Sequence, residues 1–487
     1  MKKKFLACWL FFNASFGLNI TIPNSLKSNL SVDIIDADTA EPIYNYNAAT
    51  PRLIASNVKL FTTIFGLTYL GPDFHWHTQL KHSGNIREHT LYGNVYIQGG
   101  GDPTLDSPAI YEIIAHLKHM GITTINGDVI LDSSLFNDKP TYSMLQTNQY
   151  DVDKIPPSGL IINGNRANFT IHVNGHNVSI SHNLYNIKVL NLLKLDPDST
   201  SCDMDDTVSI SFHDNLATLN GSVSPLCDNL STSFTLLSNF NYNKMVLTQI
   251  FKDFNINING DFKNDSTPKT ARLIYDHGSQ SLAHIIYDMN KTSNNLYAET
   301  IISTVGAYKA SDLYRDKLEL QGNDEQRRLQ IVGKERNHAP VVSNHSGVQA
   351  FSDGAKLYYK FLQNNNLLNT KFKLENGAGL SRYEFFTAEE VAHLLYNVNN
   401  SPIIGPILEA SLPVAAGEGS LQKKFTDFSG RFMAKTGTLN DTRAYSGYFY
   451  SKSGSKYIVV FIADNLTNQE QKLHTQSFIE QILEQLN

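Results

Sequence analysis

The chain has 487 residues, so two or three domains are expected at about 100–200 residues per domain. Hydrophobic residues make up 41% and charged residues 18% of the chain, which excludes a disordered, collagen-like or many-spanning membrane protein. The 40 basic and 46 acidic residues give a net charge of −6, and no basic cluster lies beyond the N-terminus, so nucleic acid is not an expected partner.

The N-terminus has the pattern of a secretory signal peptide. Lys2–Lys4 precede a short apolar core from Phe5 to Phe12, and the small residues Ser15 and Gly17 fit a cleavage site. This apolar core is too short to span a bilayer. We therefore expect residues 1–17 to be a cleaved signal peptide and the mature protein to be exported.

Three cysteines in a chain of this length exclude a disulfide-dense scaffold and a CxxC metal site. Signal cleavage would leave only Cys202 and Cys227, and an oxidising compartment favours a disulfide between them. His75 and His77 lie close in sequence, but no third ligand follows at a recognisable spacing. We therefore expect no metal site and no cofactor.

Hydrophobic periodicity predicts a mixed order of helices and strands. Residues 31–48 predict two strands around an acidic turn, and a helix is predicted from Ser56. From residue 93 to about 271, short β-branched segments between turn residues predict β-rich modules. Helical patterns return at 280–306 and 387–398.

The C-terminal part is predicted to hold two strands and a final helix. The strands start at Arg443 and Lys456, and the last 19 residues form an amphipathic pattern. Its polar face carries little positive charge, so we expect this helix to pack on the protein, with at most peripheral membrane contact. The charged stretch 309–345 is expected to form a solvated helix and loop.

Three short motifs occur in chain order: Ser56-Asn57-Val58-Lys59, Ser293-Asn294-Asn295 and Lys435-Thr436-Gly437-Thr438. The SxxK pattern occurs at four serines, so it is weak evidence alone, but only Ser56 starts a long apolar helix. The KTG pattern occurs once. The order and the settings of the three motifs together predict a catalytic site.

The first two motifs supply the groups for nucleophilic catalysis. Residues i and i+3 share a helix face, so the amine of Lys59 can reach the hydroxyl of Ser56 and act as its base. Burial and the nearby cation Lys435 would lower the pKa of Lys59 enough for that role. Ser293 could pass a proton to a leaving amine, and Asn295 could hold Lys59 and a substrate amide.

The third motif fits an edge strand that binds substrate. Lys435, Thr436 and Thr438 would bind a carboxylate, and Gly437 leaves room for the substrate backbone. The backbone N–H groups of Ser56 and Thr438 would form an oxyanion hole.

The three motifs resemble those of the penicillin-interacting serine enzymes. The surrounding stretches 51–63, 99–105, 291–299, 376–382, 412–421 and 434–439 are similar to D-alanyl-D-alanine carboxypeptidase/endopeptidases of peptidase family S13, the penicillin-binding protein 4-like group. The resemblance covers almost all of the mature chain. The 237 residues between Ser56 and Ser293 match the large insertion of that family and argue against a compact β-lactamase.

The resemblance implies an α/β (α+β) fold with a β-lactamase/transpeptidase-like catalytic domain. That domain would comprise residues 18–92 and 272–487. Residues 93–271 would form two mostly β domains inserted between the SxxK and SxN motifs, with the inner domain at about 165–240. Cys202 and Cys227 would lie in the inner domain.

The implied substrates are peptidoglycan stem peptides in the periplasm, cleaved through an acyl-enzyme on Ser56, with β-lactam antibiotics as covalent inhibitors. The family binds the D-centre of diaminopimelate with residues whose counterparts here are Asp151, Arg382 and Asn440. The stretch NGAGLSR departs from the common DGSGLSR at Asn376 and Ala378, so we expect the groove contacts there to differ from those of the family.

Two other functions fit parts of the same pattern. A serine β-lactamase would share Ser56 and Lys59 but release the drug quickly, and no deacylating glutamate is placed by a motif. A cell-wall-binding scaffold with a decayed site would not need the three motifs, all of which are intact here.

Overall fold

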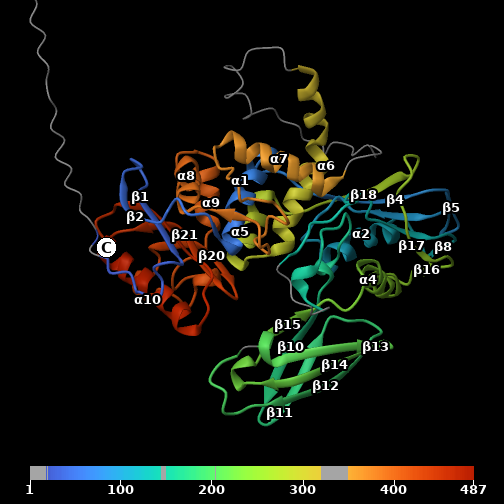
Figure 1. The fold of residues 1–487 in the computed structure, drawn as a ribbon. Coiled ribbons are helices and arrows are strands. Elements are labelled where there is room, and N and C mark those ends of the chain that lie inside the picture. The colour runs from blue at the N-terminus through green and yellow to red at the C-terminus, as the bar shows by residue number, and fades with distance from the viewer. Residues whose placement is uncertain (1–17, 19, 144–149, 203, 320–348) are drawn as a thin grey trace, which may run out of the picture.

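The computed structural model describes residue 18 and residues 20–143, 150–202, 204–319 and 349–487 (Figure 1). The expected signal peptide, residues 1–17, lies outside the described residues, as does most of the charged stretch 309–345. Within the described ranges, no helix combines the length and the apolar character needed to cross a membrane.

A five-stranded antiparallel sheet joins the two ends of the chain in the order β2-β1-β22-β21-β20 (Figure 1). Its strands are β1 (Leu30–Asp36), β2 (Pro42–Tyr46), β20 (Phe432–Leu439), β21 (Thr442–Tyr450) and β22 (Lys456–Ala463). The strands predicted in 31–48 and from Arg443 and Lys456 are therefore confirmed. The KTGT motif lies on β20, at the edge of this sheet as expected.

Both faces of the sheet are covered, which explains why β22 is apolar along its length. Ile458, Val460 and Ile462 point into a core shared with helices of one layer, and Val459 and Phe461 point into a core on the other face. The C-terminal helix α10 (Gln469–Leu486) closes the second face through buried residues that include Phe478, Ile479, Ile482 and Leu483. The expected packing of this helix on the protein is confirmed.

The first face is covered by a helical layer (Figure 1). Its helices are α1 (Val58–Leu70), α5 (Leu282–Thr292), α6 (Asn295–Glu319), α7 (Ala350–Asn364), α8 (Ala388–Asn399) and α9 (Ile404–Ser411). The short strands β3 (Arg52–Leu53) and β19 (Phe385–Phe386) pair beside it. Helix α7 was not predicted from the sequence; it packs on α6 and buries Phe351, Leu357, Tyr358 and Phe361.

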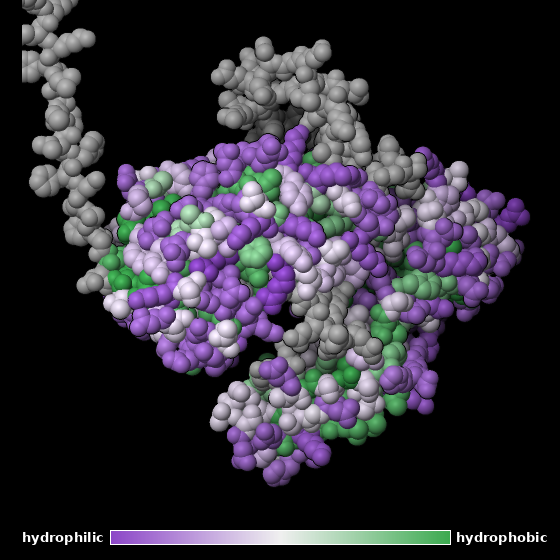
Figure 2. All heavy atoms as spheres, in the orientation of Figure 1, coloured by the Kyte–Doolittle hydropathy of each residue, from purple (hydrophilic) through white to green (hydrophobic). Residues whose placement is uncertain are grey.

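The described residues between α1 and α5 form four further sheets. Two have the orders β17-β9-β7-β4-β18 and β16-β8-β6-β5, and two have the orders β11-β10-β15 and β12-β14-β13. Their bounds are β4 (His77–His82), β5 (Asn85–Arg87), β6 (Thr90–Tyr92), β7 (Val95–Gln98), β8 (Thr124–Ile125), β9 (Val129–Asp132), β10 (Ala167–Asn174), β11 (Asn177–His182), β12 (Lys188–Leu195), β13 (Val208–His213), β14 (Leu216–Val223), β15 (Ser231–Phe234), β16 (Asn257–Ile258), β17 (Phe262–Asn264) and β18 (Arg272–Gly278). Figure 2 shows apolar patches on the surface of the lower lobe, which holds β10–β15 in Figure 1. Leu190 and Leu192 of β12 are exposed.

The described part of this region also holds two longer helices that were not predicted from the sequence. Helix α2 (Ser107–His119) starts at the N-cap Asp106, and α4 (Asn239–Asp253) starts at the N-cap Ser238. Each buries an apolar stripe at helical spacing, such as Ile110, Ile113, Ile114 and Leu117 of α2, so the sequence does carry the helical period here. A four-residue helix, α3 (Met204–Thr207), precedes β13.

Cys202 and Cys227 form the expected disulfide, which lies beside the sheet β12-β14-β13. The domain limits expected from the sequence stay a prediction. Strands β4 and β18, which lie outside 93–271, hydrogen-bond into the same sheet as β7 and β9. This pairing favours wider limits for the inserted region than residues 93 and 271.

Candidate active site

The candidate nucleophile lies in a tight turn before a buried helix. Ser56 is the middle residue of the 3-10 turn η1 (Ala55–Asn57), and α1 begins two residues later, at Val58. Ala55 has a left-handed backbone (φ 47°), which turns the chain sharply into the helix. The helix predicted from Ser56 therefore begins slightly later, and its start leaves the half-buried Ser56 side chain facing the site.

Lys59 lies in the first turn of α1 and is completely buried. Its Nζ atom lies 3.0 Å from Ser56 Oγ, 2.6 Å from Asn295 Oδ1 and 2.6 Å from the backbone oxygen of Ala378. Burial lowers the pKa of Lys59 to about 8, although nearby carboxylates, first Asp153, act in the opposite direction. The first motif therefore brings the hydroxyl and the amine together as predicted.

The second motif sits at a break between two helices. Helix α5 ends at Thr292, Ser293 adopts a left-handed backbone (φ 60°), and α6 begins at Asn295. The helical pattern 280–306 is therefore two helices. The break directs Asn295 to Lys59 and Ser293 to Lys435.

The third motif faces the second across the site. Lys435 is fully buried, and its Nζ donates to Ser293 Oγ at 2.9 Å and to the backbone oxygen of Thr436 at 2.9 Å. Burial and the neighbouring Lys59 both lower the pKa of Lys435. A Cβ on Gly437 would lie 2.5 Å from the backbone oxygen of Ile54, so only glycine lets β20 pass this close to the turn before Ser56.

Two carboxyl groups lie near Lys59, that of Glu299, which is buried, and that of Asp153, which is half-buried. Glu299 is fully buried and accepts a hydrogen bond of 2.6 Å from the Tyr142 hydroxyl, and burial raises its pKa. Asp153, in the 3-10 turn η2 (Val152–Lys154), accepts a hydrogen bond of 2.7 Å from Asn295 Nδ2. The motifs picked out none of these three side chains: Tyr142 and Asp153 lie far from them along the chain, whereas Glu299 follows Asn295 by only four residues.

The chain matches known proteins along most of its length. The sequence profile described as the D-Ala-D-Ala carboxypeptidase 3 (S13) family matches residues 19–322 and 337–486. The chain belongs to this family. The expectation of a serine-type D-Ala-D-Ala carboxypeptidase is thereby confirmed.

Two relatives have curated names. The chain is 23% identical over 445 residues to the D-alanyl-D-alanine carboxypeptidase DacB of Haemophilus influenzae, covering 86% of this chain and 81% of the relative. It is also 23% identical over 455 residues to the D-alanyl-D-alanine carboxypeptidase of Actinomadura sp. strain R39, covering 87% of this chain and 75% of that protein.

The fold agrees with that of a solved member. The crystal structure of penicillin-binding protein 4 from Haemophilus influenzae superposes with a TM-score of 0.71 at 22% identity, covering 96% of both chains. A second structure of that protein, in complex with a β-lactam, superposes with a TM-score of 0.67 at 21% identity over 96% of this chain and 97% of that one. The expected fold class is confirmed.

The three residues expected to bind diaminopimelate lie on loops and turns around the motifs. Arg382 is exposed and forms an ion pair of 2.6 Å with Asp441, which follows Asn440 in the turn after β20. Asn440 is exposed. The Asp151 carboxylate accepts from the backbone N–H of Asp153 at 2.9 Å, so Asp153 and not Asp151 contacts the catalytic motifs. The substrate-binding roles of Asp151, Arg382 and Asn440 stay predictions.

The two departures from the family pattern fit the local backbone. Asn376 Oδ1 accepts from the backbone N–H groups of Ala378 and Leu380, as an aspartate oxygen would, and Asn376 Nδ2 donates to the backbone oxygen of Thr141. Ala378 is buried and contributes its backbone carbonyl to Lys59. The backbone contact to Lys59 therefore does not depend on the side chain at 378.

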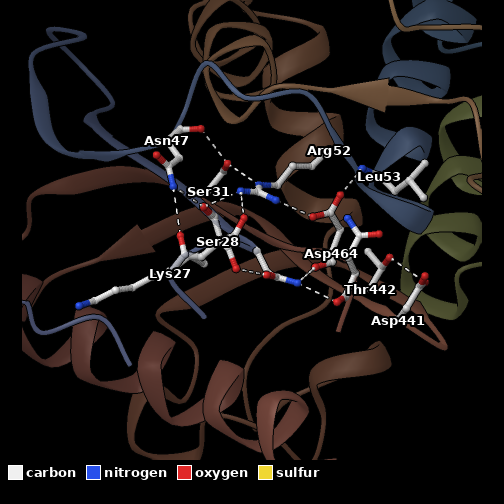
Figure 3. A network of polar contacts seen from close by, with 12 residues as sticks. Lys27, Ser28, Ser31, Asn47, Arg52, Leu53, Asp441, Thr442 and Asp464 are labelled. Carbon is white, nitrogen blue, oxygen red and sulfur yellow. Dashed lines mark hydrogen bonds and ion pairs between the residues drawn. The ribbon is translucent and has the colours of Figure 1, made fainter. Parts of the chain in front are cut away.

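A buried ion pair holds the segment that leads to Ser56 (Figure 3). Arg52 Nη1 lies 2.6 Å from Asp464 Oδ1, and both side chains are at most 6% exposed. Arg52 also donates to Ser31 Oγ and to the backbone oxygens of Ser28 and Leu30. Asp464, directly after β22, thereby holds Arg52 of β3 in place, and Arg52 lies four residues before the candidate nucleophile Ser56.

Proposed function

We propose that this chain is a periplasmic serine DD-peptidase that cleaves D-Ala-D-Ala ends or D-alanyl-diaminopimelyl crosslinks of peptidoglycan through an acyl-enzyme on Ser56. The hydrogen bonds of Lys59 carry this proposal. A neutral amine has two N–H hydrogens and one lone pair. Asn295 Oδ1 and the Ala378 oxygen accept the two hydrogens at 2.6 Å, so the lone pair faces Ser56 Oγ at 3.0 Å.

Acylation then follows from this geometry. Lys59 takes the Ser56 proton as Ser56 Oγ attacks the carbonyl carbon of the penultimate D-alanine. Backbone N–H groups of Ser56 and Thr438 stabilise the resulting oxyanion. The proton returns through Ser293, which lies beside Lys435, to the leaving amine, and the peptide C–N bond breaks. Water subsequently hydrolyses the ester and restores the Ser56 hydroxyl.

Substrate recognition is assigned to the edge strand β20. The free carboxylate of the terminal D-alanine binds Lys435, Thr436 and Thr438, and Gly437 lets the peptide lie close to the strand. The Thr436 hydroxyl already has a polar neighbour, since it lies 2.7 Å from Ser420 Oγ. Arg382, Asn440 and Asp151 remain the candidates for a diaminopimelate side chain.

A β-lactam mimics the same acyl donor. One solved family member is in complex with a β-lactam. In this chain the antibiotic would acylate Ser56. Its leaving group stays attached to the drug and does not depart, so the acylated site would be blocked. Slow release of the acyl group separates a DD-peptidase from a β-lactamase.

The test combines covalent labelling with product analysis. Intact-mass measurement should show one penicilloyl group per chain, located on Ser56 by peptide mapping and absent in Ser56→Ala. Purified muropeptides should lose D-alanine or split at the crosslink, as read by mass spectrometry. A folded wild-type protein that is never acylated would refute the proposal, and drug release faster than muropeptide cleavage would identify a β-lactamase.

A further inference from the structure

A buried carboxylate lies behind the loop that faces Lys59. Glu384 is 1% exposed. Its Oε1 accepts the backbone N–H groups of Glu375–Gly377 at 3.0, 2.8 and 2.8 Å, and its Oε2 accepts the N–H of Gly379 at 3.2 Å. The Glu384 carboxylate therefore accepts hydrogen bonds from four backbone N–H groups within five consecutive residues.

The carbonyl groups of the same loop point the other way, toward α1. The oxygen of Ala378 accepts from Lys59 Nζ at 2.6 Å, and the oxygen of Gly377 accepts from Thr62 Oγ1 at 2.7 Å. Gly377 and Gly379 have left-handed backbones (φ 69° and 89°), which allow the loop to turn its N–H groups toward Glu384 and its carbonyl groups toward α1. A Cβ on Gly379 would lie 2.1 Å from the backbone oxygen of Ala55, so the loop is pressed against the turn that carries Ser56.

We propose that Glu384 is a positioning residue for the reaction at Ser56. By binding four backbone N–H groups it fixes the Ala378 carbonyl against Lys59, and that carbonyl directs the lysine lone pair at the serine hydroxyl. This inference rests on the proposed function, because Glu384 can position the catalytic base only if Lys59 is that base. Glu384 is buried behind the loop and acts on Lys59 through the loop backbone.

The charges around Lys59 determine in which direction its pKa changes when Glu384 is replaced. Burial lowers the pKa of Lys59, whereas the nearby carboxylates of Asp153, Glu299 and Glu384 raise it. Replacing Glu384 by a neutral residue removes one of these carboxylates and loosens the carbonyl that accepts from the ammonium form. Both changes lower the pKa of Lys59.

Glu384 has its own titratable neighbours. Burial raises its pKa, the backbone N–H groups act in the opposite direction, and Glu375 adds to the increase. The Tyr358 hydroxyl also faces it across the core. Four converging donors favour the ionised form, which is the form that the loop geometry needs.

The test is Glu384→Gln, with Glu390→Gln as the matched control. Glu390 also accepts a backbone N–H, from Thr387 at 2.8 Å, but it caps α8 and has no contact with the loop. The acylation rate by a fluorescent penicillin is measured across pH and expressed per acylatable enzyme. For Glu384→Gln we expect the plateau rate to fall about 10-fold and the acid-side midpoint to fall by roughly half to one pH unit.

A purely structural role gives a different result. Glu390→Gln should lower the melting temperature and leave the rate and the midpoint per acylatable enzyme unchanged. The proposal is overturned if Glu384→Gln behaves like Glu390→Gln while wild type acylates normally; absence of wild-type acylation refutes the proposed function instead.

Glu384→Asp decides the question if the glutamine variant does not fold. Aspartate keeps the charge but has a shorter reach, so it cannot bind all four N–H groups. We expect a lower plateau with a midpoint close to that of wild type. A wild-type plateau in Glu384→Asp would overturn the proposal.

Discussion

The Nδ2 atom of Asn295 donates a hydrogen bond of 2.7 Å to the carboxylate of Asp153. This contact settles which end of the amide faces Lys59, because a carboxylate accepts only from the nitrogen. Asp153 belongs to the region between the first two motifs, and Asn295 belongs to α6. The inserted region therefore helps to orient a side chain of the candidate active site.

Asp153→Asn should impair acylation through this contact. An asparagine at 153 can accept or donate, so Asn295 is no longer held in one orientation, and a carboxylate that raises the pKa of Lys59 is lost. We expect the acylation rate to fall about 10-fold, which corresponds to about 1.4 kcal/mol in the barrier. Stopped-flow labelling measures this.

Asp151→Asn provides the comparison for that experiment. If Asp151 binds the diaminopimelate side chain, its variant should raise KM for diaminopimelate-containing peptides and leave penicillin acylation unchanged. A loss of penicillin acylation in Asp151→Asn equal to that in Asp153→Asn would contradict the distinction between the two aspartates.

The pH dependence of acylation should follow Lys59. Only the neutral amine accepts the serine proton, and the pKa of Lys59 is lowered to about 8, so the rate should rise with pH and level off above that value. Below it, the rate should fall about tenfold per pH unit. Lys59→Arg, which keeps a charge but cannot act as a base, should lose at least about 10²-fold in rate. A folded arginine variant with normal rate would remove the proposed base.

The Arg52–Asp464 pair should be important for stability. Arg52→Met leaves a buried carboxylate without its partner, at a cost of about 3–5 kcal/mol in the free energy of unfolding. Urea denaturation measures this loss. The exposed pair Lys263–Asp128 is the control, and Lys263→Met should leave the denaturation midpoint nearly unchanged. If Arg52→Met and Lys263→Met lowered the free energy of unfolding equally, burial would not make the Arg52–Asp464 pair more important than an exposed pair.

The disulfide should stabilise only the lobe in which it lies. Replacing Cys202 and Cys227 by serine and alanine opens a loop of 25 residues and should cost about 3 kcal/mol locally. Hydrogen exchange of the sheet β12-β14-β13 should accelerate. Acylation of Ser56 should not change, because the disulfide packs in a different core from α1. Reduced acylation in the double variant would contradict this separation.

The site residues that could be predicted are those whose side chains belong to short sequence motifs. Ser56 and Lys59 lie one helical turn apart, and Lys435 belongs to a KTG motif that occurs once in the chain. Asp153 and Glu384 escaped prediction because their partners are 142 residues away or are backbone N–H groups. The Ala378 carbonyl has no sequence signal, since every residue carries one.

The same reasoning applies to the fold. The strands of the main sheet were predictable because β22 is apolar on both faces and β1 is bounded by turn residues. The helices α2 and α4 carry apolar residues at helical spacing and were therefore predictable, but the short β-branched segments around them favoured strands. The break at Ser293 is a single left-handed residue within an otherwise helical pattern.

Strand β1 pairs on one side with β22, from Leu30 opposite Ala463 to Asp36 opposite Tyr457. During synthesis the segment carrying Ser56 leaves the ribosome long before the residues that complete its sheet. Pairing over such a sequence distance is slow, because the chain between the strands must first become ordered. A partly made chain can thus carry the serine without the framework that makes it reactive, and penicillin labelling would report only finished molecules.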